Sequence, residues 1–462
     1  MSPVDRSRLP RPGPDPRFAF PVADRQRLDN GLQLSTVERR GLPMVSLALV
    51  LPSGSALDPE AQPGLASMTA DMLDEGSGDR SAIDMQEALA RIGAELATET
   101  SADSVVLSLS LLDRFVPLGL QILSDIVARP RLGASDFERV RTLRTNRIRQ
   151  LKDVPGVNAE AVFARAIYGS LPYGHLSIGS SASLAAMAPA DVARFHLLQY
   201  VPSHATLIAV GAIDAPTFAR QAEEAFGRWQ ADAGRTLAPS APDSVAGVPA
   251  DALLDRRLLI VDRPGAAQTE LRVGHVGVPR KTPEFHALVL LNAVLGGHFS
   301  SRLNLNLRER KGYTYGVRSA FDFRKAAGPF SVQTSVQTDA TAEAVAETLG
   351  ELREILGDRP ADEHERSLSV ATLTKGYPRN FETAGQVARG LAQLATYELP
   401  DDTFDVFAPR IQALTADDIT AAAGRHLHPE RAVVVAVGDA ARIRGPLERT
   451  GLGEAGVVVA DL

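Results

Sequence analysis

The chain has 462 residues, of which 44% are hydrophobic and 23% charged, an ordinary composition for a globular protein of two or more domains. Its 56 acidic and 49 basic residues are interspersed and give a net charge of −7, so the charge balance does not favour nucleic-acid binding. Cysteine is absent, which excludes disulfides, thiol nucleophiles and cysteine-bound metals. Residues 1–22 contain no apolar run long enough for a signal peptide or membrane anchor. We therefore expect a cytoplasmic protein without membrane contact, or a periplasmic one if a leader was removed.

The first half of the chain begins with a proline-rich stretch and continues with alternating strands and helices. Residues 1–24, with five prolines between positions 3 and 16, predict an extended N-terminal arm. Asp29-Asn30-Gly31 predicts a hairpin turn, and a capping box from Ser81 to Asp84 marks a helix start. The remaining expected elements, in order, are a strand at 45–51, a helix at 64–75, strands at 94–100 and 105–111, and a helix at 114–128.

The second half repeats this order. It predicts a strand at 270–277, a helix with Thr282 as N-cap and Pro283 at its first position, strands at 314–322 and 330–336, and a helix at 340–356. Each half closes with an apolar strand, at 205–211 and at 432–438. The stretch 230–255 is rich in Ala, Pro, Ser and Asp without periodicity, which predicts a linker between domains at 25–229 and 256–462. Runs of strands followed by paired helices favour an α+β fold with antiparallel sheets covered by helices.

The segment Gly64 to Ser77 resembles the zinc helix of the M16 (pitrilysin and mitochondrial-processing-peptidase) zinc metallopeptidase family. Active members carry His-x-x-Glu-His there, in which two histidines bind zinc and the glutamate polarises water. The corresponding residues of this chain are Ser67, Ala70 and Asp71, none of which can replace its counterpart. The family's third ligand, a glutamate, corresponds to a position within 146–149, but residues 139–152 contain no carboxylate. The resemblance therefore implies a bacterial member without a metal site of its own.

The same stretch is rich in arginine instead. Its arginines at 141, 144, 147 and 149 predict a cationic helix face, which we interpret as a solvated surface or as salt-bridge partners for Asp and Glu.

The second half carries another family signature. Leu295 to Leu303 and Leu307 to Val317 resemble the Gly-Gly-x-x-Ser-Ser-Arg-Leu and Leu-Arg-Glu-x-x-Gly-x-x-Tyr patterns. In the family, an Arg and a Tyr from this region reach the zinc site, hold substrate and polarise the scissile carbonyl. By position these are Arg308 and Tyr315. The alternative is structural: Arg308 and its basic neighbours would complement the negative end of a helix, and Tyr315 would lie on a strand.

Taken together, the resemblance implies two α/β-roll halves in a clam-shell arrangement and a division of labour between two chains. This chain would be the non-catalytic subunit of a heterodimeric zinc metalloendopeptidase, inactive as a peptidase alone. An M16-family partner would carry zinc, in a heterodimer or a dimer of heterodimers, and this chain would need no cofactor and would supply Arg308, Tyr315 and half of a peptide chamber. A second possibility is an inert scaffold or peptide-binding protein of the same fold, and a third is a hydrolase with a different site.

Four further groups are weaker candidates for ligand binding. His426 with His428, and His364 with Glu365, could contribute to metal sites, and the acidic residues 71, 74 and 75 could bind a hard cation. Gly296-Gly297 could suggest phosphate binding, but the surrounding strand and helix pattern of a phosphate loop is missing. We interpret all four groups as structural.

Overall fold

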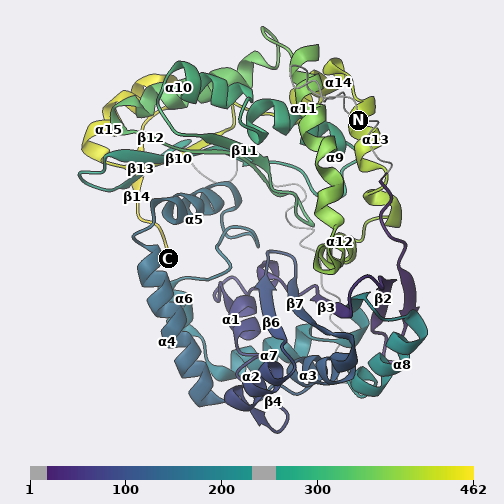
Figure 1. Cartoon of the computed structure of the whole chain (residues 1–462). Helices are drawn as coiled ribbons and strands as arrows, with labels where there is room; N and C mark the ends of the chain where they lie inside the picture. The colour runs from purple at the N-terminus through teal and green to yellow at the C-terminus, as the bar shows by residue number, and fades with distance from the viewer. Residues whose placement is uncertain (1–17, 231–255) are drawn as a thin grey trace, which may run out of the picture.

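Two six-stranded sheets, each with its own set of helices, form the two halves of the molecule (Figure 1). The computed structural model describes residues 18–230 and 256–462, so the predicted linker and most of the predicted arm lie outside the described residues. The strand order is β6-β7-β3-β8-β2-β1 in the N-terminal half and β11-β12-β10-β13-β9-β14 in the C-terminal half. The first five positions of these two orders correspond, so the repeat expected from the sequence is confirmed.

The sheets are mixed and mostly antiparallel, with one parallel pair in the N-terminal sheet and two in the C-terminal sheet. In the N-terminal sheet β3 pairs antiparallel with β7 and β8, whereas β2 pairs parallel with β8; in the C-terminal sheet β9 pairs parallel with β13. Parallel strands require a long crossover, which the helices between them provide. The strands are β1 (Asp24–Arg27), β2 (Gln33–Glu38), β3 (Met44–Leu51), β6 (Glu95–Thr100), β7 (Val105–Leu112) and β8 (Thr206–Gly211), then β9 (Leu258–Asp262), β10 (Gln268–Val276), β11 (Val317–Phe321), β12 (Pro329–Gln337), β13 (Val433–Gly438) and β14 (Gly456–Val458).

Helices of the N-terminal half follow the predicted order closely. The capping box is present, because Ser81 and Asp84 bond to each other's backbone N–H at the start of α2. The predicted helix at 64–75 is shorter than expected and ends at Asp71. The helices are α1 (Leu65–Asp71), α2 (Ala82–Arg91), α3 (Val116–Ala128), α4 (Ala134–Leu151), α5 (Pro155–Tyr168), α6 (Ser181–Ala186), α7 (Pro189–Gln199) and α8 (Ala215–Phe226).

One helix start of the C-terminal half was predicted wrongly. Thr282 is not the N-cap of α9, which begins after Glu284, although the Thr282 hydroxyl still accepts the Glu284 N–H. Gly296 and Gly297 do not follow the helix but lie inside a wide π-type turn that continues it. The helices are α9 (Phe285–Asn292), α10 (Thr341–Glu354), α11 (Glu363–Lys375), α12 (Ala384–Tyr397), α13 (Phe407–Ala413), α14 (Ala416–His426) and α15 (Ala440–Leu447).

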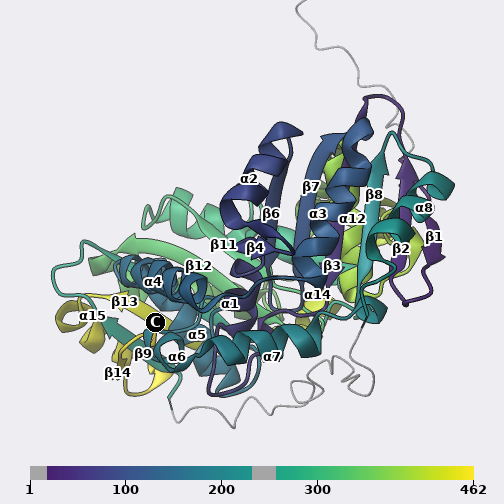
Figure 2. The same cartoon turned by 90° about the horizontal axis from the view of Figure 1, so that it is seen from below.

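The two halves exchange one helix each (Figures 1 and 2). Helix α5 belongs to the N-terminal half by sequence, yet its Val162 and Phe163 pack in one apolar cluster with Val435 and Val437 of the C-terminal sheet. Helix α12 packs in the opposite direction, where Val387, Ala388 and Leu391 cover Ala48, Val50, Ile208 and Val210 of the N-terminal sheet. Each sheet therefore has one face closed by its own helices and the other by the opposite half.

Chain segments near both ends also cross between the halves. Phe18 and Phe20 pack against Phe381 of the C-terminal half, with ring centroids 5.2 Å apart in each pair. Leu462 is buried in the N-terminal core, and the Ser181 hydroxyl donates to its main-chain oxygen at 3.1 Å. Within residues 18–230 and 256–462, no helix combines the length and the apolar character that a bilayer crossing requires.

Candidate functional site

The three positions of the lost zinc motif lie on α1. Ser67 and Ala70 are buried, and Asp71, the last residue of the helix, is exposed. Gly64, which precedes the helix, has a φ of +93° and lies against Gly179, where a Cβ would come within 2.8 Å of the Gly179 Cα. This contact needs glycine, so α1 is held against the loop that follows α5.

A guanidinium group reaches α1 from α4. Arg144, only 8% exposed, donates from Nη1 to Asp71 Oδ2 at 2.5 Å and from Nη2 to the Ile178 carbonyl at 2.8 Å. The residues that the sequence placed opposite the motif do not point to it, because Asn146, Arg147 and Arg149 are exposed. Arg139, one helical turn or more before Arg144, pairs with Glu75 just beyond α1. Two arginines of α4, Arg139 and Arg144, are thus salt-bridge partners for the acidic end of α1, whereas Arg141 pairs with Glu138 of its own helix.

These donors do not fit a zinc ion. Ser67 and Ala70 offer no nitrogen or carboxylate ligand, and the one carboxylate of the set, Asp71, already accepts from a guanidinium. A dication placed between Asp71 and Arg144 would meet like charge. Among the described residues, no group of three or more His, Cys, Asp or Glu side chains is placed to hold a metal ion. We derive no chemical step through zinc in this chain.

A fully buried carboxyl group lies behind α1. Asp58 accepts the backbone N–H groups of Gly64 and Ala66, each at 2.6 Å, and His175 Nε2 is 3.8 Å from its Oδ2. Burial raises the pKa of Asp58 from 3.8 to about 7, although the two N–H bonds and the charge of Arg144 oppose the shift. Burial also lowers the pKa of His175. The pair therefore anchors the start of α1 rather than presenting charge to solvent.

Arg308 and Tyr315 lie together in a hollow of about 440 Å³ on the C-terminal half. Its walls come from the turn at 296–299, the edge of β11 and the neighbouring strand β12, with Glu270 of β10 on one side. The hollow thus joins the two predicted residues, which lie seven positions apart in the chain.

The two side chains are presented differently. The guanidinium of Arg308 lies 3.5 Å above the Phe299 ring and 3.2 Å from Glu309, and its Nη1 is buried with no hydrogen-bond partner among the described residues. The Tyr315 side chain is 94% exposed. A buried charged donor without an acceptor is costly unless a ligand completes it.

The structural alternative for this region is wrong for Tyr315, and the basic neighbours of Arg308 have carboxylate partners. Tyr315 does not lie on a strand, because β11 begins at Val317 and the predicted strand start at 314 is three residues early. The basic neighbours of Arg308 are structural: Lys311 Nζ is 2.7 Å from Glu347, and Arg310 lies 3.6 Å from the buried Glu351.

Asn304 is a residue of this site that the sequence did not reveal. Its side-chain amide donates to the Val317 carbonyl at 2.8 Å and accepts the Val317 N–H at 3.0 Å, as a neighbouring strand would. The outer edge of β11 is therefore closed beside the hollow. Gly296 packs against the same strand, where a Cβ would come within 2.6 Å of the Ser319 nitrogen, and this close approach explains the glycine better than phosphate binding does.

The remaining candidates have structural partners. His426 bonds to Glu284, which Arg425 also contacts. The backbone N–H of His428 donates to His275, and Glu365 forms a bidentate pair with Arg302, whose side chain is buried.

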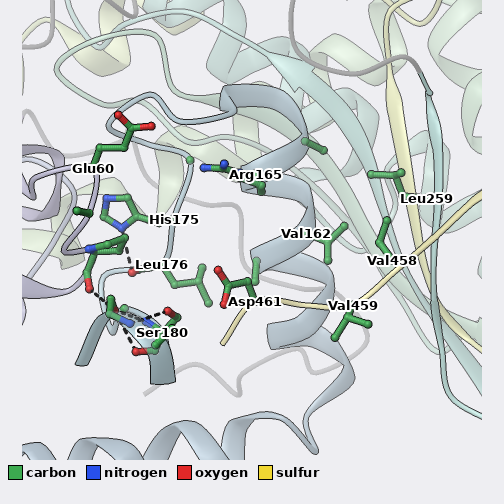
Figure 3. A pocket seen from close by; sticks show the side chains of 18 residues that line it. Glu60, Val162, Arg165, His175, Leu176, Ser180, Leu259, Val458, Val459 and Asp461 are labelled. Atoms are coloured by element: carbon green, nitrogen blue, oxygen red, sulfur yellow. Dashed lines mark hydrogen bonds between the residues drawn. The ribbon is translucent and has the colours of Figure 1, made fainter. Parts of the chain in front are cut away.

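A second cavity, of about 560 Å³, lies at the junction of the halves (Figure 3). Val162 of α5, Leu259 and Val458 form an apolar wall, while Glu60 and His175 lie on the opposite side. The loop that carries His175 continues to the Ile178 carbonyl bound by Arg144, so this cavity and α1 share one supporting loop.

Comparisons with known families agree with this geometry. A profile described as insulinase (peptidase family M16) matches residues 36–169, and a profile described as peptidase M16 inactive domain matches residues 186–370. Together they span well over half of the chain. An uncharacterized zinc protease of Mycobacterium tuberculosis is 26% identical over 424 residues, covering 92% of this chain and 94% of the relative. The mitochondrial-processing peptidase subunit beta of Mus musculus is 25% identical over 212 residues, covering 45% and 42%.

Solved structures give the same result. A peptidase M16 inactive domain from Pseudomonas fluorescens superposes with a TM-score of 0.81 at 25% identity, covering 90% of this chain and 97% of that one. A protease from Helicobacter pylori has the same fold, with a TM-score of 0.80 at 17% identity over 90% and 99% of the two chains. The chain belongs to the M16 peptidase family, and the ligand positions of its zinc motif carry Ser67, Ala70 and Asp71.

Proposed function

We propose that this chain is the non-catalytic subunit of a two-chain zinc peptidase, to which it supplies Arg308, Tyr315 and one side of a peptide-binding chamber. The partner is an M16-family chain that carries the zinc ligands, and the substrate is an extended peptide. The observation that carries the proposal is the Arg308 guanidinium beside an exposed tyrosine, because one buried nitrogen of this guanidinium has no acceptor within residues 18–230 and 256–462.

The chemistry of these two side chains suits the carbonyl group of a peptide. Hydrolysis passes through an oxyanion, and a guanidinium or phenol fixed beside that oxygen stabilises it most where water is excluded. The Phe299 ring and Glu309 fix the plane of the Arg308 guanidinium before substrate binds. Little conformational entropy is therefore lost when the guanidinium binds the carbonyl group. Zinc on the partner chain would supply the activated water.

A two-chain arrangement also agrees with the relatives. The mouse relative is by its name one subunit of a processing peptidase, and the Pseudomonas structure is described as an inactive domain. The mycobacterial relatives are called zinc proteases, so family members of this size include chains expected to bind zinc.

Affinity purification of the tagged chain from its source organism tests the partner. We expect a second M16 chain that contains His-x-x-Glu-His, in about equal amount, and peptidase activity of the pair that either chain alone lacks. Purification of this chain alone, or with unrelated proteins only, would contradict the proposal and favour an inert scaffold of the same fold.

Tyr315→Phe in the reconstituted pair tests the residue role. Because Tyr315 is almost fully exposed, the change leaves folding and assembly intact, and we expect kcat to fall about tenfold through the lost hydroxyl. An unchanged kcat in an assembled complex would assign Tyr315 a structural role. Tyr313→Phe, two residues earlier on the same loop, is the matched control.

A further inference from the structure

We propose that Arg144 is an internal cation that replaces a bound metal as the link between α1, α4 and the loop at 176–179. The inference concerns the N-terminal half alone and does not depend on the proposed peptidase role. The N-terminal half then needs no metal ion to hold these three elements together, because the Arg144 guanidinium supplies the positive charge between them.

Arg144 lies on the buried face of α4. The buried residues of α4 are Phe137, Val140, Arg144 and Ile148, which share one face of the helix. Three of the four are apolar and pack in the N-terminal core, so a charged residue in this row needs compensation by partners.

The partners of Arg144 come from elements far apart in the sequence. Asp71, 73 residues earlier, accepts from Nη1, and the carbonyls of Ser177 and Ile178, more than 30 residues later, accept from Nη2 at 3.5 and 2.8 Å. The charge of Arg144 also acts on Asp58, the buried carboxyl that accepts the N–H groups at the start of α1. One guanidinium therefore contacts the end of α1, lies near the group that anchors its start, and holds the loop against which Gly64 packs.

A second pair on the same two elements provides a comparison. Arg139 pairs with Glu75, and this pair also joins α4 to the segment after α1. The Arg139 side chain is 48% exposed, whereas that of Arg144 is 9% exposed. Their carboxylate partners differ in the opposite sense, since Glu75 is 13% exposed and Asp71 46%, so solvent reaches one member of each pair. The inner pair, Arg144 with Asp71, differs from the outer pair, Arg139 with Glu75, in the main-chain carbonyls of the loop at 176–179 that Arg144 also binds.

A double-mutant cycle on the whole chain tests the inference. Asp71→Asn keeps the shape of the acceptor, and Arg144→Met keeps the apolar stem. We expect each change to lower Tm by roughly 3 °C and the double variant to lower it by no more than the larger single effect, because both changes remove one interaction. The matched control is the outer pair, Glu75→Gln with Arg139→Met, in which we expect shifts below about 1 °C.

Metal dependence is measured on the same proteins. We expect the Tm of the unaltered chain to be the same with EDTA and with added zinc chloride. Additive effects of the inner pair, or a lower Tm in EDTA, would overturn the inference. Should Arg144→Met fail to fold, Arg144→Lys, which keeps the charge and loses the forked donor, is expected to fold and to show a smaller loss than Asp71→Asn.

Discussion

The two halves share one strand order, yet their polar residues are arranged in opposite ways. At the end of α1 in the N-terminal half, Asp71 accepts from Arg144 and Glu75 from Arg139. In the C-terminal half, Arg308 of the π-type turn at 304–310 keeps one buried nitrogen without a partner among the described residues, and Tyr315 extends into solvent. Arg144 also keeps its buried Nε without a hydrogen-bond partner among the described residues, so the difference lies in the partners and the surroundings. Arg144 binds a carboxylate and main-chain carbonyls from distant parts of the chain, whereas Arg308 contacts its sequence neighbour Glu309 and lines a hollow that a ligand can enter. This difference supports the proposed role of the C-terminal half in binding a peptide.

Arg308→Met gives the strongest test of this contrast. In the complex with a zinc-bearing partner we expect kcat/KM to fall about 100-fold, because the donor for the substrate carbonyl is lost. The free energy of unfolding should be unchanged or higher, because the substitution removes a buried donor that has no partner among the described residues. Steady-state kinetics measure the first effect and urea unfolding the second. A variant that is less stable but has normal kinetics would show that Arg308 stabilises the fold and does not serve a ligand.

Asn304→Ala should show that the C-terminal sheet depends on its amide cap. The substitution leaves the N–H and the carbonyl of Val317 without partners, so we expect a loss of about 2 kcal/mol in the free energy of unfolding. The outer strand of the other sheet, β6, alternates exposed and half-buried residues and offers the control Thr98→Ala, for which we expect less than about 0.5 kcal/mol. Equal losses would mean that the cap on β11 contributes nothing.

Asp58 should give the N-terminal half a pH dependence of stability. Its pKa is raised by burial to about 7, so the folded chain keeps a proton that the unfolded chain releases near pH 4. This contribution is fully present below about pH 4 and is lost as the pH rises to 7, by about 1.4 kcal/mol per pH unit in between. Urea unfolding at pH 5, 6 and 7 of the parent and of Asp58→Asn, which does not titrate, measures it. A constant difference between the two proteins would show that Asp58 is ionised throughout.

Phe299→Leu should have the smallest effect. The ring lies 3.5 Å from the Arg308 guanidinium and orients it, and such contacts contribute about 0.5–1 kcal/mol at exposed sites. We expect kcat/KM of the complex to fall about threefold, while Phe299→Tyr, which keeps the aromatic face, restores it. If the Leu variant had the kinetics of the parent, Glu309 and not Phe299 would be the residue that positions Arg308.

Much of the fold could be predicted from the sequence because its periodicity is local. The alternating pattern at 105–111 and the Ser81 capping box led to elements within one residue of those in the structure. The parallel pairing of β2 with β8 could not be predicted, since it joins segments about 170 residues apart with no turn signal between them. Thr282 carried a good capping pattern, but the chain adopts helical geometry only from Phe285.

The candidate site was predicted less completely. The motif positions indicated the loss of zinc ligands, and the spacing of Arg308 and Tyr315 placed both in one hollow. Which arginine of α4 reaches α1 depends on the rotation of the helix, so the arginines at 141, 144, 147 and 149 could not be told apart from the sequence, and the structure shows that Arg144 makes the contact. Asn304 and Phe299 act through contacts made by the π-type turns, which leave no periodic signal in the sequence.

The exchange of α5 and α12 has a consequence for dividing the polypeptide. A cut within 231–255 would give two fragments, each carrying the helix that covers the other's sheet. Either fragment alone would expose an apolar sheet face such as Ala48, Val50, Ile208 and Val210. Co-expressed fragments are therefore expected to associate as an obligate pair, and neither fragment is expected to remain soluble without the other.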